Sequence, residues 1–167
     1  MAIPASISHY LERHGVSFSV VEHSVAFTAQ EEAHAAHVPG REWAKAVVCM
    51  VDDQPTLAVL PADHVVDLDR FRTICGASSV RLATETELQP LYSDCELGAM
   101  PPLGSLYKQP VVVDKSLTVD PEILFNAGSH REAIRMRYRD FEDLVKPTVA
   151  EFGIPVGVSS QADRRTS

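Results

Sequence analysis

Three short stretches of the sequence combine residue types that could do chemistry, and the first is the loop 98–104. It reads Gly-Ala-Met-Pro-Pro-Leu-Gly and has almost no polar side chains. Proline fixes φ and lacks an N–H, while glycine permits positive φ and lets another molecule approach the backbone. Such a rigid loop offers main-chain N–H groups that could hold a carbonyl oxygen or a phosphate. The alternative is a stiff connector before a strand that starts at Pro110, because proline and glycine mark turns generally.

The second stretch is a run of nearly uncharged residues, Trp43 to Met50, that contains one lysine, Lys45. A lysine is rarely fully buried without a partner. Lys45 could therefore point into a cleft and hold a phosphate or a carboxylate as a point charge. It could equally be a lysine at a strand end, with its aliphatic stem packed and its ammonium group in water.

The third stretch, Gly128-Ser129-His130, lies at a turn between two predicted strands. Glycine allows the bend, and the serine and histidine side chains could orient a substrate or move a proton. The alternative is a turn with a surface histidine. The sequence shows no acidic neighbour that would complete a Ser-His-acid triad, and it has no G-x-S-x-G elbow.

For other polar residues the sequence favours a structural role over a functional one. His34 and His37 share one face of a predicted helix, but no third ligand is indicated and there is no H-E-x-x-H motif. A solvated helix face is therefore favoured over a metal hydrolase, and we expect neither a metal nor another cofactor. The acidic pairs Glu31-Glu32 and Asp52-Asp53 are assigned to a helix cap and to a turn.

Arginines recur at every second position in 135–139, at Arg135, Arg137 and Arg139. This period places them on one face of a strand. They could contact phosphates. They could also pair with the many carboxylates of this acidic chain at the surface, where such pairs contribute little, and this second interpretation is favoured.

Hydrophobic periodicity and end signals predict the elements that must position these residues. Capping boxes at Thr28–Glu31 and Thr84–Glu87 start two helices, and Asp67 and Asp140 are expected to cap two more. The predicted helices cover about 3–15, 29–37, 67–76, 84–91 and 140–145. The predicted strands cover about 16–20, 43–51, 56–60, 79–83, 111–113, 123–125 and 134–139.

The strands come in hairpin-like pairs between helices, without regular alternation of strand and helix. This favours an α+β fold with a mixed, largely antiparallel, curled sheet flanked by helices. No repeat or linker divides residues 1–155, so we expect one domain there. Residues 156–167 have the composition of a disordered C-terminal tail.

Composition narrows the functional class. The 167 residues carry a formal net charge of −8, which argues against a protein that grips a long nucleic-acid backbone but not against one that touches a nucleic-acid end. No apolar run approaches the ~20 residues of a membrane span, and the first residues do not read as a signal peptide. Three widely spaced cysteines indicate a reducing compartment. We therefore expect a cytoplasmic protein that does not associate with membranes.

Taken in order, the motifs resemble the YbaK/prolyl-tRNA-synthetase-associated editing family, whose members hydrolyse mischarged tRNA. The resemblance covers about residues 20–146. The matching parts are His23-Ser24 with Thr28, the helix 29–37 with Val38-Pro39-Gly40, Lys45, the run 57–63, the loop 98–104, Val112-Val113-Asp114 and the Gly128 turn. Each is weak alone, and their common order is what makes the match specific.

This resemblance implies a partly barrel-like mixed sheet and a site at the sequence motifs above. The catalytic part would comprise Lys45, Gly98, Pro101, Pro102 and Gly104, with Lys45 on the 3′-terminal adenosine or its phosphate. The substrate-binding part would comprise Thr28, Ala46, Ala99, Met100, Leu103, Gly128, Ser129 and His130. His130 would admit or exclude amino acids by size and polarity.

The implied activity is trans-editing: hydrolysis of mischarged aminoacyl-tRNA, with tRNA(Pro) carrying Ala, Cys or Ser as the expected substrate. The implied partners are the aminoacylated acceptor end of the tRNA and an aminoacyl-tRNA synthetase. The alternative is a non-catalytic module of the same fold that binds aminoacyl-tRNA or a synthetase. Two departures motivate it: Ala46 replaces a polar residue of many relatives, and 92–96 differs from the commoner Thr-Gly-Tyr pattern. A third departure, Leu103 where many relatives have Phe, bears on the amino-acid specificity.

Overall fold

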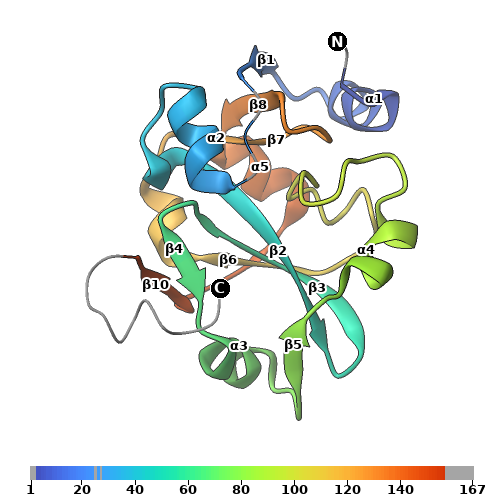
Figure 1. The fold of residues 1–167 in the computed structure, drawn as a ribbon, viewed down its shortest axis with the longest axis vertical. Coiled ribbons are helices and arrows are strands. Elements are labelled where there is room, and N and C mark those ends of the chain that lie inside the picture. Colours follow the sequence, from blue (N-terminus) through green and yellow to red (C-terminus); the bar gives the residue numbers. More distant parts are fainter. Residues whose placement is uncertain (1–2, 25, 27, 157–167) are drawn as a thin grey trace.

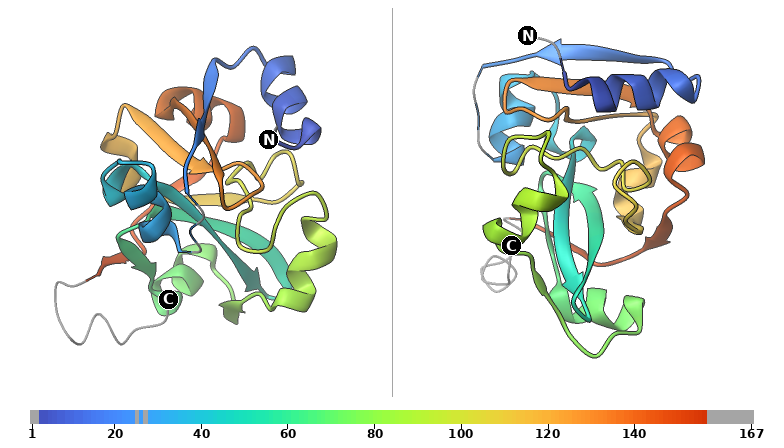
Figure 2. Two further views of the ribbon diagram at one scale, coloured as in Figure 1. Left: turned by 45° about the horizontal axis from the view of Figure 1, so that its top comes forward. Right: turned by 90° about the vertical axis from the view of Figure 1, so that its right-hand side faces the viewer.

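A five-stranded sheet and a three-stranded sheet make up most of the fold, and the main core lies between them. The computed structural model describes residues 3–24, 26 and 28–156, and within them it holds five α-helices and three β-sheets (Figure 1). The three-stranded sheet and α1 lie at one end, and α3 with β5 lies at the other (Figures 1 and 2). Within the described residues, none of the helices has the length and apolar character that a membrane span requires.

The larger sheet has the strand order β5-β2-β3-β6-β9. Strands β2 and β3 form an antiparallel hairpin, β5 pairs antiparallel with β2, and β6 and β9 are added in parallel. Asp52 and Asp53 connect the hairpin with φ of 47° and 66°, the two-residue turn that suits the twist of paired strands. The strands are β2 (Ala44–Val51), β3 (Gln54–Pro61), β5 (Val80–Leu82), β6 (Val111–Asp114) and β9 (Thr148–Ala150).

The second sheet has the order β1-β8-β7, and both of its pairings are antiparallel. Strands β7 and β8 form a hairpin whose connection, 127–131, contains the Gly128-Ser129-His130 turn. A third sheet pairs β10 with β4. These strands are β1 (Phe18–Glu22), β7 (Glu122–Asn126), β8 (Glu132–Arg137), β4 (His64–Val66) and β10 (Gly153–Pro155).

The helices start where the sequence signals predict, with one exception. Both capping boxes are present, and Asp67 caps its helix through its side chain. The prediction that Asp140 caps the last helix is wrong, because that helix begins at Tyr138 and Asp140 lies in its first turn. The helices are α1 (Ala5–Arg13), α2 (Ala29–Ala35), α3 (Leu68–Cys75), α4 (Glu85–Leu91) and α5 (Tyr138–Val145), with 3₁₀ segments η1 (Gly40–Glu42) and η2 (Lys115–Val119).

The main core lies between the two larger sheets. It joins Ala44 and Val48 of β2 to Phe125 of β7 and Ile134 of β8, and it also takes in Leu103 from the 98–104 loop. A second cluster lies on the other face of the larger sheet, beneath α3, and a third lies between α2 and the start of β2. The loop with the Pro-Pro pair is therefore fixed by the same core that holds the sheets together.

The predicted α+β class and the mixed, largely antiparallel pairing are confirmed. The strands are divided among three sheets, and the largest stays open, with β5 and β9 at its edges. The basic strand is shorter than predicted because Arg139 belongs to α5. The predicted tail lies outside the described residues, apart from Val156.

Candidate active site where two loops meet

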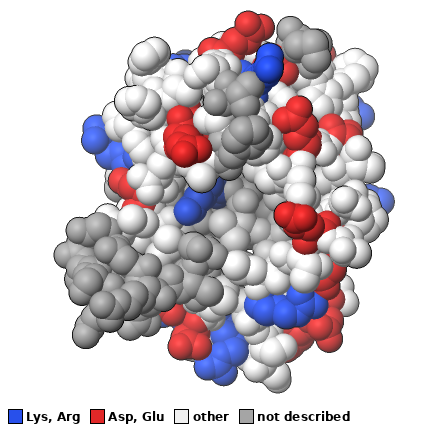
Figure 3. Space-filling model, in the orientation of Figure 1, with Lys and Arg blue, Asp and Glu red and all other residues white. Residues whose placement is uncertain are grey.

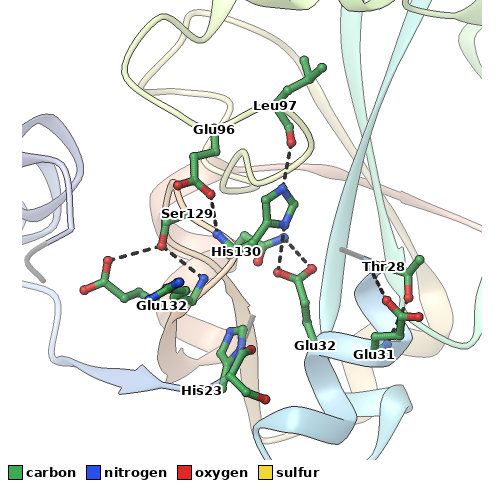
Figure 4. A network of polar contacts seen from close by, with 12 residues as sticks. His23, Thr28, Glu31, Glu32, Glu96, Leu97, Ser129, His130 and Glu132 are labelled. Atoms are coloured by element: carbon green, nitrogen blue, oxygen red, sulfur yellow. Dashed lines mark hydrogen bonds and ion pairs between the residues drawn. The ribbon is translucent and has the colours of Figure 1, made fainter. Parts of the chain in front are cut away.

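The two glycine-containing loops are joined by backbone hydrogen bonds. The Gly128 N–H donates to the Ala99 carbonyl at 3.0 Å, and the Glu96 N–H donates to the Gly128 carbonyl at 2.8 Å. The structure thus brings together two of the three stretches that the sequence singled out, although they are about 25 residues apart in the chain. Figure 4 shows the surroundings of this junction.

The 98–104 loop is held mainly by its own buried side chains. Ala99 and Leu103 are fully buried, Met100 nearly so, and Pro101 and Pro102 are also buried. These side chains anchor the loop, and the groups it can offer to a ligand are those of its main chain.

The two glycines of this loop serve different needs. A Cβ at Gly104 would lie 2.3 Å from Cγ2 of Val111 and 2.5 Å from the Gln109 carbonyl oxygen, so only glycine fits there. Gly98 is exposed and has a φ of +83°, and a Cβ there would lie 3.6 Å from Cε1 of His130. Gly104 therefore allows close packing, whereas Gly98 allows a turn against the His130 ring.

The loop has five N–H groups, because its two prolines have none. Ala99 donates to the Glu96 carbonyl at 3.0 Å, and among the described residues the N–H groups of Gly98, Met100, Leu103 and Gly104 have no acceptor. Of these four residues Gly98 alone is exposed, so its N–H is the donor most accessible to a carbonyl oxygen or an oxyanion.

His130 is buried, so the alternative of a surface histidine is wrong. Its side chain lies against the loop, with Nε2 at 2.8 Å from the Leu97 carbonyl. Because a carbonyl only accepts, Nε2 carries the proton in this contact. The His130 backbone N–H donates to Oε1 of Glu96 at 2.9 Å. Two groups of one residue thus tie the turn to the segment that precedes Gly98.

Glu32 is a site residue that the sequence analysis missed, because it was assigned to a helix cap together with Glu31. Only Glu31 belongs to the capping box. Glu32 is 1% exposed, its Oε1 accepts a hydrogen bond from Nδ2 of Asn126 at 3.2 Å, and its Oε2 lies 3.4 Å from Nδ1 of His130. Burial raises the pKa of Glu32 to about 7, against the lowering effect of Asn126 and His130.

A sequence signal for Glu32 did exist. Ala29, Ala33 and Ala36 have helical spacing and pack in the third cluster, so they mark the inward face of α2. Glu32 lies three residues after Ala29 and four before Ala36, and therefore on that face. A carboxylate on an apolar helix face is unusual enough to indicate a buried polar partner.

Ser129 is occupied within its own turn. Its hydroxyl donates to Oε1 of Glu132 at 3.3 Å and accepts from the Arg131 N–H at 3.3 Å. Beside the turn lies a hollow of about 470 Å³. Its lining contains three carboxylates among Glu22, His23, Glu96, Ser129, Arg131 and Glu132.

Lys45 is half-buried on β2, where it pairs with Leu60 of β3. Burial lowers its pKa, against the opposite effect of Asp63, and within the described residues no hydrogen bond or ion pair engages its ammonium group. Side chains alternate along a strand, so Lys45 lies on the face opposite Ala44 and Ala46, which belong to the main core with the loop.

Among the described residues, no hydrogen bond or ion pair joins Lys45 to the other two stretches. Strand β5 pairs only with Cys49–Val51, so the start of β2 is an edge of the sheet. A long side chain at this edge can be reached by a ligand. Two of the substrate-binding residues assigned by resemblance lie outside the two loops. Thr28 is exposed and uses its hydroxyl to accept from the Glu31 N–H. The other, Ala46, is half-buried against the main core.

The histidines and arginines outside the two loops form no further site. Among the described residues, no group of three or more His, Cys, Asp or Glu side chains could hold a metal ion. Arg135 lies 3.5 Å from Glu122 of the neighbouring strand, as the interpretation of surface pairing expects. On the face seen in Figure 3, acidic and basic side chains are interspersed, and no continuous basic surface forms on it.

Comparison with known proteins identifies the family. The chain is similar to a solved structure described as a candidate trans-editing enzyme for prolyl tRNA synthetase, with 24% identity, a TM-score of 0.79, and coverage of 89% of this chain and 95% of that one. It is also similar to hypothetical protein APE2540, with 18% identity, a TM-score of 0.80, and coverage of 89% and 99%. At these identities the likeness shows the fold.

None of the curated proteins matches the sequence at a significant level. A family model described as the aminoacyl-tRNA editing domain matches residues 23–144, which include α2, Lys45, the 98–104 loop and the Gly128–His130 turn. The resemblance inferred from the motifs is therefore confirmed, and the chain belongs to the aminoacyl-tRNA editing domain family.

Proposed function

We propose that this protein deacylates mischarged aminoacyl-tRNA in trans, and that its substrate is tRNA(Pro) carrying Ala, Cys or Ser. The observation that carries the proposal is the junction of the 98–104 loop with the Gly128–His130 turn, inside the region that matches the editing-domain family. One structural neighbour is described as a candidate trans-editing enzyme for prolyl tRNA synthetase, which favours tRNA(Pro).

The reaction needs little from the protein beyond positioning and charge stabilisation. Water attacks the carbonyl carbon of the ester, and the bond to the ribose oxygen breaks, which yields the free amino acid and a tRNA with a free hydroxyl group. N–H groups of the 98–104 loop, with that of the exposed Gly98 the most accessible, would stabilise the oxyanion, at ~3 kcal/mol for each donor. Because the ester is already activated, no strong protein nucleophile is required.

His130 is poorly suited to be the general base. Its Nε2 carries a proton toward the Leu97 carbonyl, and its Nδ1 faces Glu32. Both ring nitrogens are thus directed at protein groups. A hydroxyl group of the substrate's own ribose is the base that remains, and His130 then acts as a wall of the aminoacyl pocket.

Lys45 would hold the terminal nucleotide. Its half-buried ammonium group gains a partner when a phosphate approaches the open edge of β2. This is a positioning role, and it places the ester relative to the loop. The net charge of −8 and the mixed charges of the surface suit recognition of the acceptor end rather than of the whole tRNA.

Selection among amino acids would depend on pocket shape, since one methylene is worth only ~1–3 kcal/mol of discrimination. A pocket that admits small side chains and excludes proline fits an editing role. Ala46 and Leu103, where this chain departs from many relatives, are the positions expected to tune that selection.

The test is deacylation of Ala-, Ser-, Cys- and Pro-tRNA(Pro) by the wild type and by Lys45→Ala. Lys115→Ala is the matched control, because Lys115 is exposed and lies 4.0 Å from Glu151, outside the site. We expect selective hydrolysis of a mischarged species, reduced ~10–100-fold in Lys45→Ala, as the loss of a hydrogen bond to a charged group predicts, and unchanged in the control.

Equal rates for Lys45→Ala and the wild type would overturn the proposed role of Lys45. Tight binding of tRNA(Pro) without turnover of any of the four substrates would instead support the binding-module alternative.

A further inference from the structure

Glu32 is the most deeply buried carboxylate of the site, and the reaction outlined above does not use it. It lies one turn into α2, close to a cluster formed by Ala33, Trp43, Leu124 and Ala133. A carboxylate in such surroundings is costly unless polar partners compensate for the lost water.

Those partners come from two other elements. Nδ2 of Asn126, at the end of β7, donates to Oε1 of Glu32, and Nδ1 of His130 lies 3.4 Å from Oε2 (Figure 4). Asn126 thus fixes the carboxyl group through one oxygen and leaves the other directed at the imidazole. The arrangement links α2, β7 and the turn that carries His130.

The Glu32–His130 contact requires a proton. The proton on Nε2 is committed to the Leu97 carbonyl, so Nδ1 faces the carboxyl group with either a proton or a lone pair. A lone pair against a carboxylate would repel, and it would leave a buried charge without compensation. One proton held between Nδ1 and Oε2 removes both costs, whichever atom carries it.

Several charged groups surround the pair and would influence that proton. Glu31 on α2 has a charge that adds to the raised pKa of Glu32. Glu96 on the loop accepts from the His130 backbone, and Arg131 and Glu132 follow His130 in the chain. Three of these four groups are acidic, which favours retention of the shared proton.

We propose that Glu32 is a positioning residue for His130: a proton shared between the two side chains holds the imidazole ring against Gly98 and so fixes the wall that selects the aminoacyl group. The role of His130 in selecting the aminoacyl group rests on the proposed function. The shared proton and the fixed ring are inferred from the positions of Glu32, Asn126 and His130 and do not depend on that function. A residue of α2, remote from the 98–104 loop in sequence, thereby controls the shape of the pocket.

Glu32→Gln is the informative variant, because it keeps the shape of the side chain. The glutamine oxygen can still accept from Asn126, and its NH₂ group can donate to Nδ1 of His130. The ring should therefore stay in place but be locked in its neutral form, with the proton on Nε2. Glu32→Asp withdraws the carboxyl group by one methylene, and Glu32→Ala removes it.

The first readout is independent of activity. Histidine labelled with ¹⁵N, with the His130 signals assigned by comparison with His130→Gln, reports whether each ring nitrogen carries a proton, accepts a hydrogen bond or has a free lone pair. We expect the Nδ1 signal of the wild type to be that of a nitrogen that carries a proton or accepts a hydrogen bond, and to move toward that of a free lone pair in Glu32→Ala. Identical Nδ1 signals in these two proteins would overturn the proposal.

The second readout is selectivity, measured as the ratio of deacylation rates of the preferred mischarged tRNA and Pro-tRNA(Pro). We expect this ratio to fall tenfold or more in Glu32→Ala, to fall less in Glu32→Asp, and to lose its pH dependence in Glu32→Gln. Glu85→Gln, on the exposed first turn of α4, is the control and should match the wild type.

The two readouts separate the two proposals. If no charged tRNA is turned over but the ¹⁵N signals differ as expected, the proposed function fails and the shared proton stands. If deacylation proceeds and its selectivity is the same in Glu32→Ala as in the wild type, the selecting role of Glu32 is overturned and the proposed function stands.

Discussion

Helices α2 and α4 begin in the same way and differ at one inward position. Each starts with a threonine whose hydroxyl accepts from the N–H of a glutamate three residues later. The carboxylate of that glutamate in turn accepts a hydrogen bond from the threonine N–H. The next residue faces the interior in both. In α4 it is Leu88, which packs on the main core, and in α2 it is Glu32, which faces His130.

The comparison shows that the same capping box can present either a core residue or a site residue on the inward face of a helix. The capping box fixes where the helix begins, and so which residue of the first turn points inward. An apolar residue at that position attaches α4 to the core. A carboxylate at the equivalent position costs free energy unless it is paired, and it is retained in α2 where it contacts a residue of the candidate site.

The largest expected effect is the cost of truncating the two inward residues. Glu32→Ala leaves Asn126 and His130 without their buried partner, so we expect the free energy of unfolding to fall by about 3 kcal/mol. Leu88→Ala should cost about 1 kcal/mol, because Leu88 is only half-buried. Urea denaturation of both variants measures the difference. Equal losses would show that the carboxylate is no more important to stability than an ordinary packed side chain.

The next largest effect is the pH dependence of stability that the Glu32 carboxylate causes. Burial raises the pKa of Glu32 from its usual 4.5 to about 7, so between these pH values the folded protein keeps a proton that the unfolded chain releases. The stability of the wild type relative to Glu32→Gln should therefore fall by about 2 kcal/mol as the pH rises from about 4.5 to about 7. Urea denaturation of the two proteins at pH 5 and pH 7 checks this, and parallel curves would contradict it.

Glu87, in the capping box of α4, should respond with the opposite sign. Its pKa is lowered to about 2, mainly by the Arg81 side chain and also by the Thr84 N–H. Its contribution is therefore present above pH 4.5 and is lost as the pH falls toward 2. Glu87→Gln should flatten the acid limb of the stability curve and leave the limb between pH 5 and pH 7 unchanged.

The smallest effect should be the same in both helices. Thr28→Ala and Thr84→Ala each remove one capping hydroxyl, at about 1 kcal/mol of unfolding free energy. Thermal denaturation of the two variants provides the check. A much larger loss for Thr28→Ala would mean that the Thr28 hydroxyl contributes more to stability than the cap of α2.

Local signals in the sequence were sufficient for the elements that depend on them. The capping boxes, the Asp67 cap and the turn at Asp52 and Asp53 are properties of four or five consecutive residues, and the structure has all of them. Strands β4, β9 and β10 were missed, because each has three residues and exists through pairing with a distant segment.

The start of α5 was misjudged for a related reason. Tyr138 continues the alternation of Ile134 and Met136, so it reads as a strand residue. It also lies three residues before Phe141, and both side chains enter the main core from the first turn of a helix. The same residue satisfies both periods, and tertiary packing decides between them.

The two loops of the candidate site could be predicted from the sequence, but the contacts that bring them together could not. The 98–104 loop and the Gly128 turn are visible as composition, but their junction is made by two backbone hydrogen bonds that no residue type indicates. Burial of His130 and Glu32 depends on α2 folding over β7 and β8. That arrangement is a property of the whole topology.

The strand order of the three-stranded sheet, β1-β8-β7, affects how the protein folds during its synthesis on the ribosome. Strand β1 emerges well before its partner β8, which is completed only at Arg137. Throughout that interval β1 is a strand without a neighbour, and the turn that carries His130 has not yet been made. Long-range pairing of this kind folds slowly and exposes strand edges to other chains. A nascent chain of this protein thus acquires its candidate site only after Arg137 has been added.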